Sequence, residues 1–115
     1  MVNQVTLVGR LTRDPELKLT QAGTSVTNIT LAVKRSYRNQ AGEYEADFIS
    51  CIFWNKAAEH IVHYCHKGLL IAIIGSIQTR NYENQEGKRI YVTEVAAEYF
   101  RFLEPKREEE QLITI

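Results

Sequence analysis

The sequence predicts an all-β fold with one helix, arranged as a small barrel of five strands with two protruding β-hairpin arms. Runs of alternating apolar and polar residues, typical of strands, make up most of the chain. One stretch has the apolar spacing of a helix instead. An eight-residue pattern, R-x-Y-x-N-Q-x-G, occurs at residues 35–42 and again at 80–87. Strand-like runs flank a turn-prone Asn-Gln-x-Gly stretch in each copy, which predicts two hairpins.

Length and composition favour one soluble domain. The chain has 115 residues, of which 44% are hydrophobic, enough for a single core. We expect the folded domain at residues 1–105 and a short acidic and apolar tail at 106–115. The formal net charge of zero excludes a uniformly basic nucleic-acid binder, so local clusters of charge must be considered instead. No apolar run approaches the ~20 residues that cross a bilayer, and the N-terminus lacks a secretory pattern, so a cytoplasmic protein without membrane contact is expected.

The first two strand regions are expected at residues 3–11 and 26–34. In the first, Val5, Leu7 and Leu11 share one parity. A Pro-containing turn at 14–16 ends it, and an Ala-Gly-Thr turn follows at 22–24. The second region alternates apolar with polar residues and leads directly into the first arm.

The third strand region, residues 46–54, is apolar on both faces. Phe48, Ile52 and Trp54 share one face. The other face carries Ile49, Cys51 and Phe53. Such a strand is either internal or has one face committed to a partner. Together with the isoleucine-rich run at 69–77, the face with Ile49, Cys51 and Phe53 exceeds what one small barrel hides, which predicts contact between subunits.

The helix is expected at residues 55–67. Asn55 suits the N-cap, and Gly68 is placed to end the helix in a left-handed conformation. One buried stripe follows from the spacing of Ala58, Ile61, Val62 and Cys65.

The last two strand regions are expected at residues 69–79 and 89–103, on either side of the second arm. Gly75 interrupts the first of them, which often marks a bulge or a tight bend in a barrel strand. Five strands with a helix between the third and the fourth is the layout of an OB-fold, a Greek-key barrel that commonly binds oligonucleotides.

The candidate binding residues are aromatic rings interleaved with cations. Tyr37 and Tyr82 lie on the arms, and Phe48 and Trp54 on the third strand. Their basic neighbours are Lys34, Arg35, Arg38, Lys56, Arg80, Lys88 and Arg89. Rings can stack on bases without reading them while cations follow the phosphates, which is the requirement for binding single strands. The alternatives are that Phe48 and Trp54 belong to the core, that the tyrosines pack against the body, and that the cations form an ordinary solvated surface.

Metal and enzyme chemistry are not expected. His60, His63 and His66 lie near Cys65, but Cys65 belongs to the buried stripe, whereas His60 and His63 fall on the polar face. In a cytoplasmic protein Cys51 and Cys65 are expected as thiols, and both lie in apolar patterns typical of a core. The chain lacks the GxxxxGK[ST], HExxH and GxSxG signatures. A metal-dependent nuclease, a third functional alternative, would need converging carboxylates, and the sequence does not place Asp47, Glu94 and Glu98 together. We expect no cofactor and no catalysis.

Several short stretches together resemble the bacterial single-stranded DNA-binding protein family. They are residues 8–17 (VGRLTRDPEL), Gly68, 78–82 (QTRNY), 87–88 (GK) and 93–95 (TEV). The likeness runs from about Met1 to Pro105. It implies an OB-fold that assembles as a homotetramer, wraps single-stranded DNA without sequence preference, and acts in replication, recombination, repair or DNA uptake in the cytoplasm, at the nucleoid.

The resemblance also assigns residues. The family's four stacking positions fall on Tyr37, Phe48, Trp54 and Tyr82. Its basic contacts fall on Lys56, Lys67 and Arg80, with Arg10 also plausible, whereas one commonly basic position is Asn81 here. The alternative function is an OB-fold module that binds a protein partner or structured RNA.

The C-terminus departs from the family pattern. Full-length members carry a long linker and an acidic tip ending in Pro-Phe, whereas this chain ends with residues 108–115, EEEQLITI. It is similar to the short paralogues of Gram-positive bacteria, or to versions from phages or mobile elements. Weak tail-mediated contacts with replication or recombination proteins are therefore expected. A truncated sequence is the competing explanation for the short end.

Overall fold

Six strands and one helix make up the computed structural model, which describes residues 1–104. The tail expected at 106–115 lies outside these residues. The elements are β1 (Val5–Leu11), β2 (Lys18–Leu19), β3 (Ser25–Arg38), β4 (Tyr44–Trp54), α1 (Asn55–Tyr64), β5 (Leu70–Glu83) and β6 (Arg89–Phe102). Of the helices in the described part of the chain, none is long and apolar enough to span a membrane.

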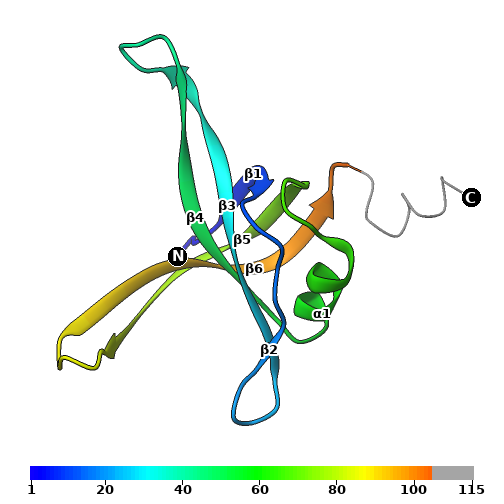
Figure 1. Cartoon of the computed structure of the whole chain (residues 1–115), viewed down its shortest axis with the longest axis vertical. Helices are drawn as coiled ribbons and strands as arrows, with labels where there is room; N and C mark the ends of the chain where they lie inside the picture. The colour runs from blue at the N-terminus through cyan, green and yellow to red at the C-terminus, as the bar shows by residue number, and fades with distance from the viewer. Residues whose placement is uncertain (105–115) are drawn as a thin grey trace, which may run out of the picture.

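The five long strands close into a barrel. The sheet order is β1-β5-β6-β4-β3-β2, and an additional pairing of β1 with β3 closes it. All pairings are antiparallel except β4 with β6, which is parallel. This arrangement, with the helix between β4 and β5, confirms the predicted OB-fold. The β3–β4 and β5–β6 hairpins extend beyond the barrel as two arms that diverge from each other (Figure 1).

The barrel interior is filled by aliphatic side chains and one aromatic ring. Leu31, Phe53, Ile61, Ile71 and Ile73 are all fully buried. Two come from β5 and one from α1, whose apolar stripe packs against the barrel as the spacing predicted. The edge-to-face contact between Phe53 and Phe100, with ring centroids 5.8 Å apart, extends the core toward β6.

The predictions made for the apolar faces of β4 and β5 require a correction. The face with Ile49, Cys51 and Phe53 points into the barrel, and Cys51 and Phe53 are fully buried. The expectation that this face exceeds what one barrel hides was therefore wrong. On β5, Ile77 shares the parity of the buried Ile71 and Ile73 but is 48% exposed, because beyond Gly75 the strand leaves the barrel wall and becomes part of the arm.

Gly75 lies at a register shift, as predicted. Ile74 pairs with Tyr99, but Gly75 pairs with Ala97, so Glu98 has no partner in β5. A Cβ atom at Gly75 would overlap the carbonyl oxygen of Ala96 on β6. Glycine is therefore required here by the close approach of two backbones.

The helix differs from the prediction at both ends. Trp54, in an extended conformation, is the N-cap, and no side chain caps the helix, so the N-cap role expected for Asn55 was wrong. Asn55 instead has a φ of 58°, a left-handed conformation that Asn tolerates better than most residues. The helix ends at Tyr64, before Lys67. Gly68 has the expected positive φ, 89°, but in the turn that follows the helix, where its N–H donates to the Leu11 carbonyl.

Candidate nucleic-acid interface

The two arms end in the same turn. The side-chain oxygen of Asn39 accepts hydrogen bonds from the backbone N–H groups two and four residues ahead, at 2.9 and 3.0 Å. The Asn84 oxygen accepts the equivalent pair at 3.0 and 2.9 Å. Gly42 and Gly87 have φ values of 78° and 80°, the left-handed position that closes a three-residue hairpin loop. The repeated sequence pattern therefore corresponds to a repeated structure.

A third hairpin, between β2 and β3, uses a close variant of this turn. Thr20 replaces Asn, and its hydroxyl accepts the Thr24 N–H at 3.1 Å. Gly23 has a φ of 82°, and its N–H donates to the Thr20 carbonyl at 2.9 Å. Sequence reasoning found this turn but missed the strand before it, since only two residues of β2 pair with β3. The shared Gln-x-Gly signal was present at residues 21–23.

The arm tyrosines are exposed and lie beside arginines. Tyr37 is 63% exposed and Tyr82 is 47% exposed. The Arg35 guanidinium lies 6.0 Å from the Tyr37 ring centroid, and the Arg80 guanidinium lies 5.9 Å from that of Tyr82. The alternative in which these rings are buried against the body is therefore wrong for the chain described.

Phe48 and Trp54 lie on the outer face of β4. Phe48 is 69% exposed and Trp54 is 41% exposed, whereas Cys51 and Phe53 between them are fully buried. The alternative in which both rings belong to the core is also wrong for this chain. Phe48 stands opposite Ala32, and Trp54 stands opposite Val26, so both rings lie on the β3–β4 hairpin.

The four rings are spread over two hairpins. Tyr37, Phe48 and Trp54 all belong to the β3–β4 hairpin, between the arm and the start of α1. Tyr82 lies on the other, diverging arm (Figure 1). Such an arrangement suits an extended ligand that contacts successive rings better than a compact ligand in one cavity.

The predicted cations fall into three groups. Arg10, Arg35 and Arg80 form ion pairs with Glu104, Asp47 and Glu94 respectively, at 2.9–3.0 Å. Lys34 and Arg38 lie 4.3 and 5.1 Å from the ring centroid of Tyr44. The remaining predicted cations are exposed: Lys56 in the first turn of α1, Lys67 in the turn before β5, and Lys88 and Arg89 on the second arm.

Arg10 lies in a different setting from the other predicted contacts. Its guanidinium donates to the Gly68 carbonyl at 2.8 Å and to both carboxylate oxygens of Glu104. Glu104 also accepts the Leu70 N–H at 3.0 Å. That hydrogen bond and the Arg10 guanidinium hold the pKa of Glu104 below its usual value. These contacts tie the ends of β1, β5 and β6 together.

Sequence reasoning missed Tyr44 and the two acidic partners on β4 and β6. Tyr44 is 45% exposed and stands opposite Arg38 beside the turn of the first arm. An aromatic residue two positions after the Asn-Gln-x-Gly turn was the available signal. Asp47 and Glu94 gave no such signal, because their partners depend on the strand register.

The His and Cys residues in α1 and directly after it do not form a metal-binding cluster. The His60 ring packs edge-to-face against Tyr64 and Phe100, at centroid distances of 4.7 and 5.5 Å. Within residues 1–104, no group of three or more His, Cys, Asp or Glu side chains could hold a metal ion. Burial raises the pKa of Cys51 to about 11, so its thiol stays protonated at neutral pH.

The sequence of this chain is similar to those of known proteins. The family model described as "Single-strand binding protein family" matches residues 2–103. The chain is 58% identical over 111 residues to "Single-stranded DNA-binding protein" of Lactiplantibacillus plantarum, covering 96% of this chain and 56% of that protein. It is 55% identical over 109 residues to "Single-stranded DNA-binding protein B" of Bacillus subtilis, covering 95% and 96% of the two chains. The chain thus spans little more than half of the first relative and nearly all of the second.

Proposed function

Because the chain belongs to the single-strand binding protein family, we propose that it binds and protects single-stranded DNA without sequence preference. The observation that carries the proposal is the outward position of Phe48 and Trp54 on a strand whose inner face is buried. Rings that remain exposed are not stabilised by burial in the core, and their faces are accessible for stacking on bases. The chain acts by binding, with no catalytic role.

Two physical terms supply affinity in this proposal. Stacking of a base on an aromatic ring contributes ~1–3 kcal/mol and tolerates any sequence, because every base has a flat face. Each phosphate contact makes the affinity fall with salt, with a log-log slope of about −0.7 on a single strand. Duplex DNA hides its base faces, so the rings select single strands by geometry.

The test uses the single tryptophan, Trp54, as a reporter. Adding oligo-dT of increasing length should quench its fluorescence strongly, and the affinity should fall as salt rises. Duplex DNA of the same length is the matched control and should quench weakly. Unchanged emission at saturating dT would overturn the stacking role of Trp54. Binding of a structured RNA or a protein in preference to dT would support the OB-fold module with another ligand.

The proposal includes assembly as a homotetramer. The outer surface of the chain carries several exposed apolar side chains, and a shallow hollow is lined by Ala72, Ile74, Tyr99, Phe100 and Arg101. Covering this surface in an assembly would remove apolar area from water. This surface replaces the inner face of β4 as the argument for subunit contact.

The proposed setting is the cytoplasm, at the nucleoid, during replication, recombination, repair or DNA uptake. Contacts of residues 106–115 with replication or recombination proteins are proposed to be weak. Strong, tail-dependent capture of a helicase or primase in a pull-down would contradict that part of the proposal.

A further inference from the structure

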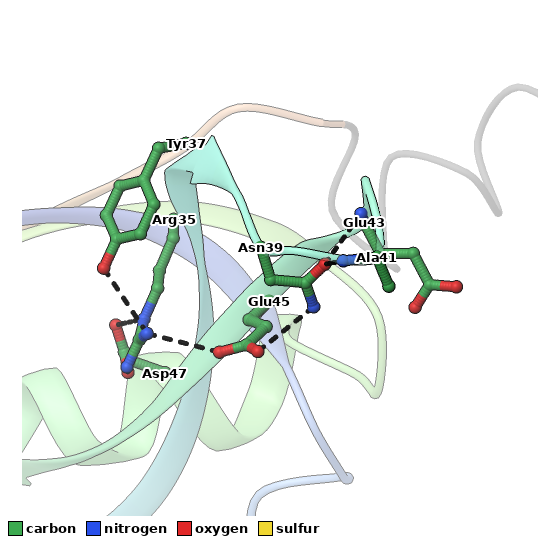
Figure 2. A network of polar contacts seen from close by, with 7 residues as sticks. All are labelled: Arg35, Tyr37, Asn39, Ala41, Glu43, Glu45 and Asp47. Atoms are coloured by element: carbon green, nitrogen blue, oxygen red, sulfur yellow. Dashed lines mark hydrogen bonds and ion pairs between the residues drawn. The ribbon is translucent and has the colours of Figure 1, made fainter.

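Arg35 is tightly engaged by acidic side chains of the neighbouring strand. Its Nε and Nη2 atoms donate to the Asp47 carboxylate at 2.9–3.2 Å, and Nη1 donates to Glu45 at 3.2 Å. The Tyr37 hydroxyl lies 3.4 Å from Nη1, within the same network (Figure 2). Hydrogen bonding to Asp47 raises the pKa of Arg35, and the same contact lowers the pKa of Asp47.

Arg80 on the second arm also pairs with a carboxylate of the neighbouring strand. Its Nε donates to Oε1 of Glu94 at 3.0 Å. The Glu94 side chain is only 1% exposed, whereas that of Arg80 is 51% exposed. A buried carboxylate thus holds an arginine that reaches the surface, and the second Glu94 oxygen has no hydrogen-bond partner within residues 1–104.

The two sites share the same spacing along their strands, although the first arm has a register shift between Lys34 and Arg38 and the second has none around Arg80. Asp47 stands opposite Val33, two residues before Arg35, and Glu94 stands opposite Gln78, two residues before Arg80. In each arm the tyrosine lies two residues after the arginine. Each arm therefore contains a carboxylate, an arginine and a tyrosine at the same spacing, although only the last two belong to the sequence repeat.

We propose that Asp47 and Glu94 are positioning residues, which hold Arg35 and Arg80 so that each guanidinium orients the tyrosine two residues ahead. Arg35 and Arg80 then serve mainly as supports for the rings, and the exposed lysines make the phosphate contacts. This inference rests on the proposed binding of single-stranded DNA.

The chemistry of the side chains supports this division of roles. A guanidinium whose N–H fork faces a carboxylate has fewer donors left for phosphate, and the pair carries no net charge. A ring held in one orientation before binding loses less freedom when a base stacks on it. Exposed lysines such as Lys88 present a compact cationic group to the DNA backbone.

The decisive test is Asp47→Asn, because two explanations predict opposite signs. If Asp47 acted only through its charge, removing it should strengthen the binding of DNA, a polyanion. The substitution replaces one accepting oxygen by an NH₂ group. If Asp47 positions Arg35, the guanidinium then no longer holds Tyr37 in place, and oligo-dT binding should weaken about three- to tenfold. Fluorescence anisotropy of a labelled dT oligonucleotide measures either result.

Glu43→Gln is the matched control. Glu43 lies in the turn of the same arm, and its carboxylate points away from the network (Figure 2). The substitution removes the same charge without touching Arg35, so affinity should stay unchanged or rise slightly. A cooperative thermal unfolding transition checks that each variant is folded. Glu94 is buried and its replacement risks unfolding the chain, so the main test uses Asp47→Asn. Glu94→Gln is the corresponding variant in the second arm.

Arg35→Lys separates support from phosphate contact. Lysine keeps the charge but lacks the fork that engages Asp47. We expect weaker dT binding with an unchanged salt slope, whereas Lys88→Gln should reduce the slope by about 0.7. Tighter binding by Asp47→Asn, or wild-type affinity in Arg35→Lys, would overturn the inference while the wild-type protein still binds dT. Failure of the wild-type protein to bind dT would instead overturn the proposed function.

Discussion

At the scale of single residues, Phe48 shows how alternation along β4 separates the surface from the core. It is 69% exposed, while Cys51 and Phe53 farther along the same strand are fully buried. A ring in this position adds little to folding stability, because most of its area remains in water. Covering the ring with a bound ligand would therefore contribute to the free energy of binding.

Phe48→Ala should weaken oligo-dT binding by ~1–3 kcal/mol, because one stacking surface is lost. The free energy of unfolding should change by less than about 0.5 kcal/mol, as for most surface positions. Titration of labelled dT and thermal unfolding measure the two quantities. Tyr91→Ala is the matched control, since Tyr91 is 78% exposed but lies outside the proposed set of rings. Wild-type affinity in Phe48→Ala would contradict the proposed role.

Glu104 predicts a pH dependence of stability. Its pKa in the folded chain is lowered by the hydrogen bond from Leu70 and by Arg10. A lowered carboxyl pKa contributes stability above the unfolded pKa of about 4.3, and this contribution is lost as pH falls through the folded pKa. Glu104→Gln should therefore lower Tm at pH 7, and the Tm values of the two proteins should converge as pH falls below the unfolded pKa and through the lowered folded pKa. A constant Tm difference across this range would contradict the prediction.

At the scale of elements, the hairpin turns depend on one side-chain oxygen and one glycine each. Thr20, Asn39 and Asn84 supply the oxygens. Gly87 has open space around its missing side chain, with Glu83 Oε1 3.6 Å from the position of a Cβ atom. A side chain there would meet no obstacle, so only the backbone conformation demands glycine.

Gly87→Ala should destabilise the second arm by ~1–2 kcal/mol, the cost of a left-handed conformation for an L-residue. The effect should appear as faster amide hydrogen exchange in the arm, with a smaller change in the global Tm. Gly87→Asn should have a milder effect, because Asn tolerates this conformation. Equal exchange rates in all three proteins would show that the turn does not control the order of the arm.

The helix and β4 show how much of the fold could be predicted from the sequence. The repeat predicted both arms, and the apolar stripe predicted the buried face of α1, because each signal is local. The inward face of β4 could not be chosen, since both faces are apolar and burial depends on the neighbouring strands. The pairing of Arg35 with Asp47 depends on a register that only the folded hairpin fixes. All four predicted rings are exposed, but Tyr44 and the two positioning carboxylates were missed.

At the scale of the whole molecule, the barrel depends on close backbone contacts. Cβ atoms at Gly9 and Gly75 would overlap the carbonyl oxygens of Ala32 and Ala96. Gly75→Ala should therefore destabilise the entire fold by ~1–3 kcal/mol or more, since two strands must move apart. Its global Tm should fall further than that of Gly87→Ala, whose cost is confined to the arm. The reverse order of Tm values would contradict this assignment.

The proposed tetramer predicts a defined particle mass. Static light scattering at micromolar concentration should give about four times the chain mass of 13.3 kDa. Ile74→Glu should reduce this mass, because it places a charge in the hollow beside Tyr99. A particle of 13.3 kDa for the wild-type protein would exclude the tetramer.

The closure of the sheet has a consequence for how the molecule comes apart. β4 meets β6 only through the pairs Cys51–Val95 and Ile52–Ala96, and β1 meets β3 only through two further pairs. The barrel thus consists of two strand groups, β1-β5-β6 and β2-β3-β4, which are joined by two short pairings. Contacts between buried side chains are the main interaction that holds the two groups together. On heating, the two short pairings should break before the long pairings within either strand group. The two arms should then move independently, while the hydrogen bonds within each hairpin remain.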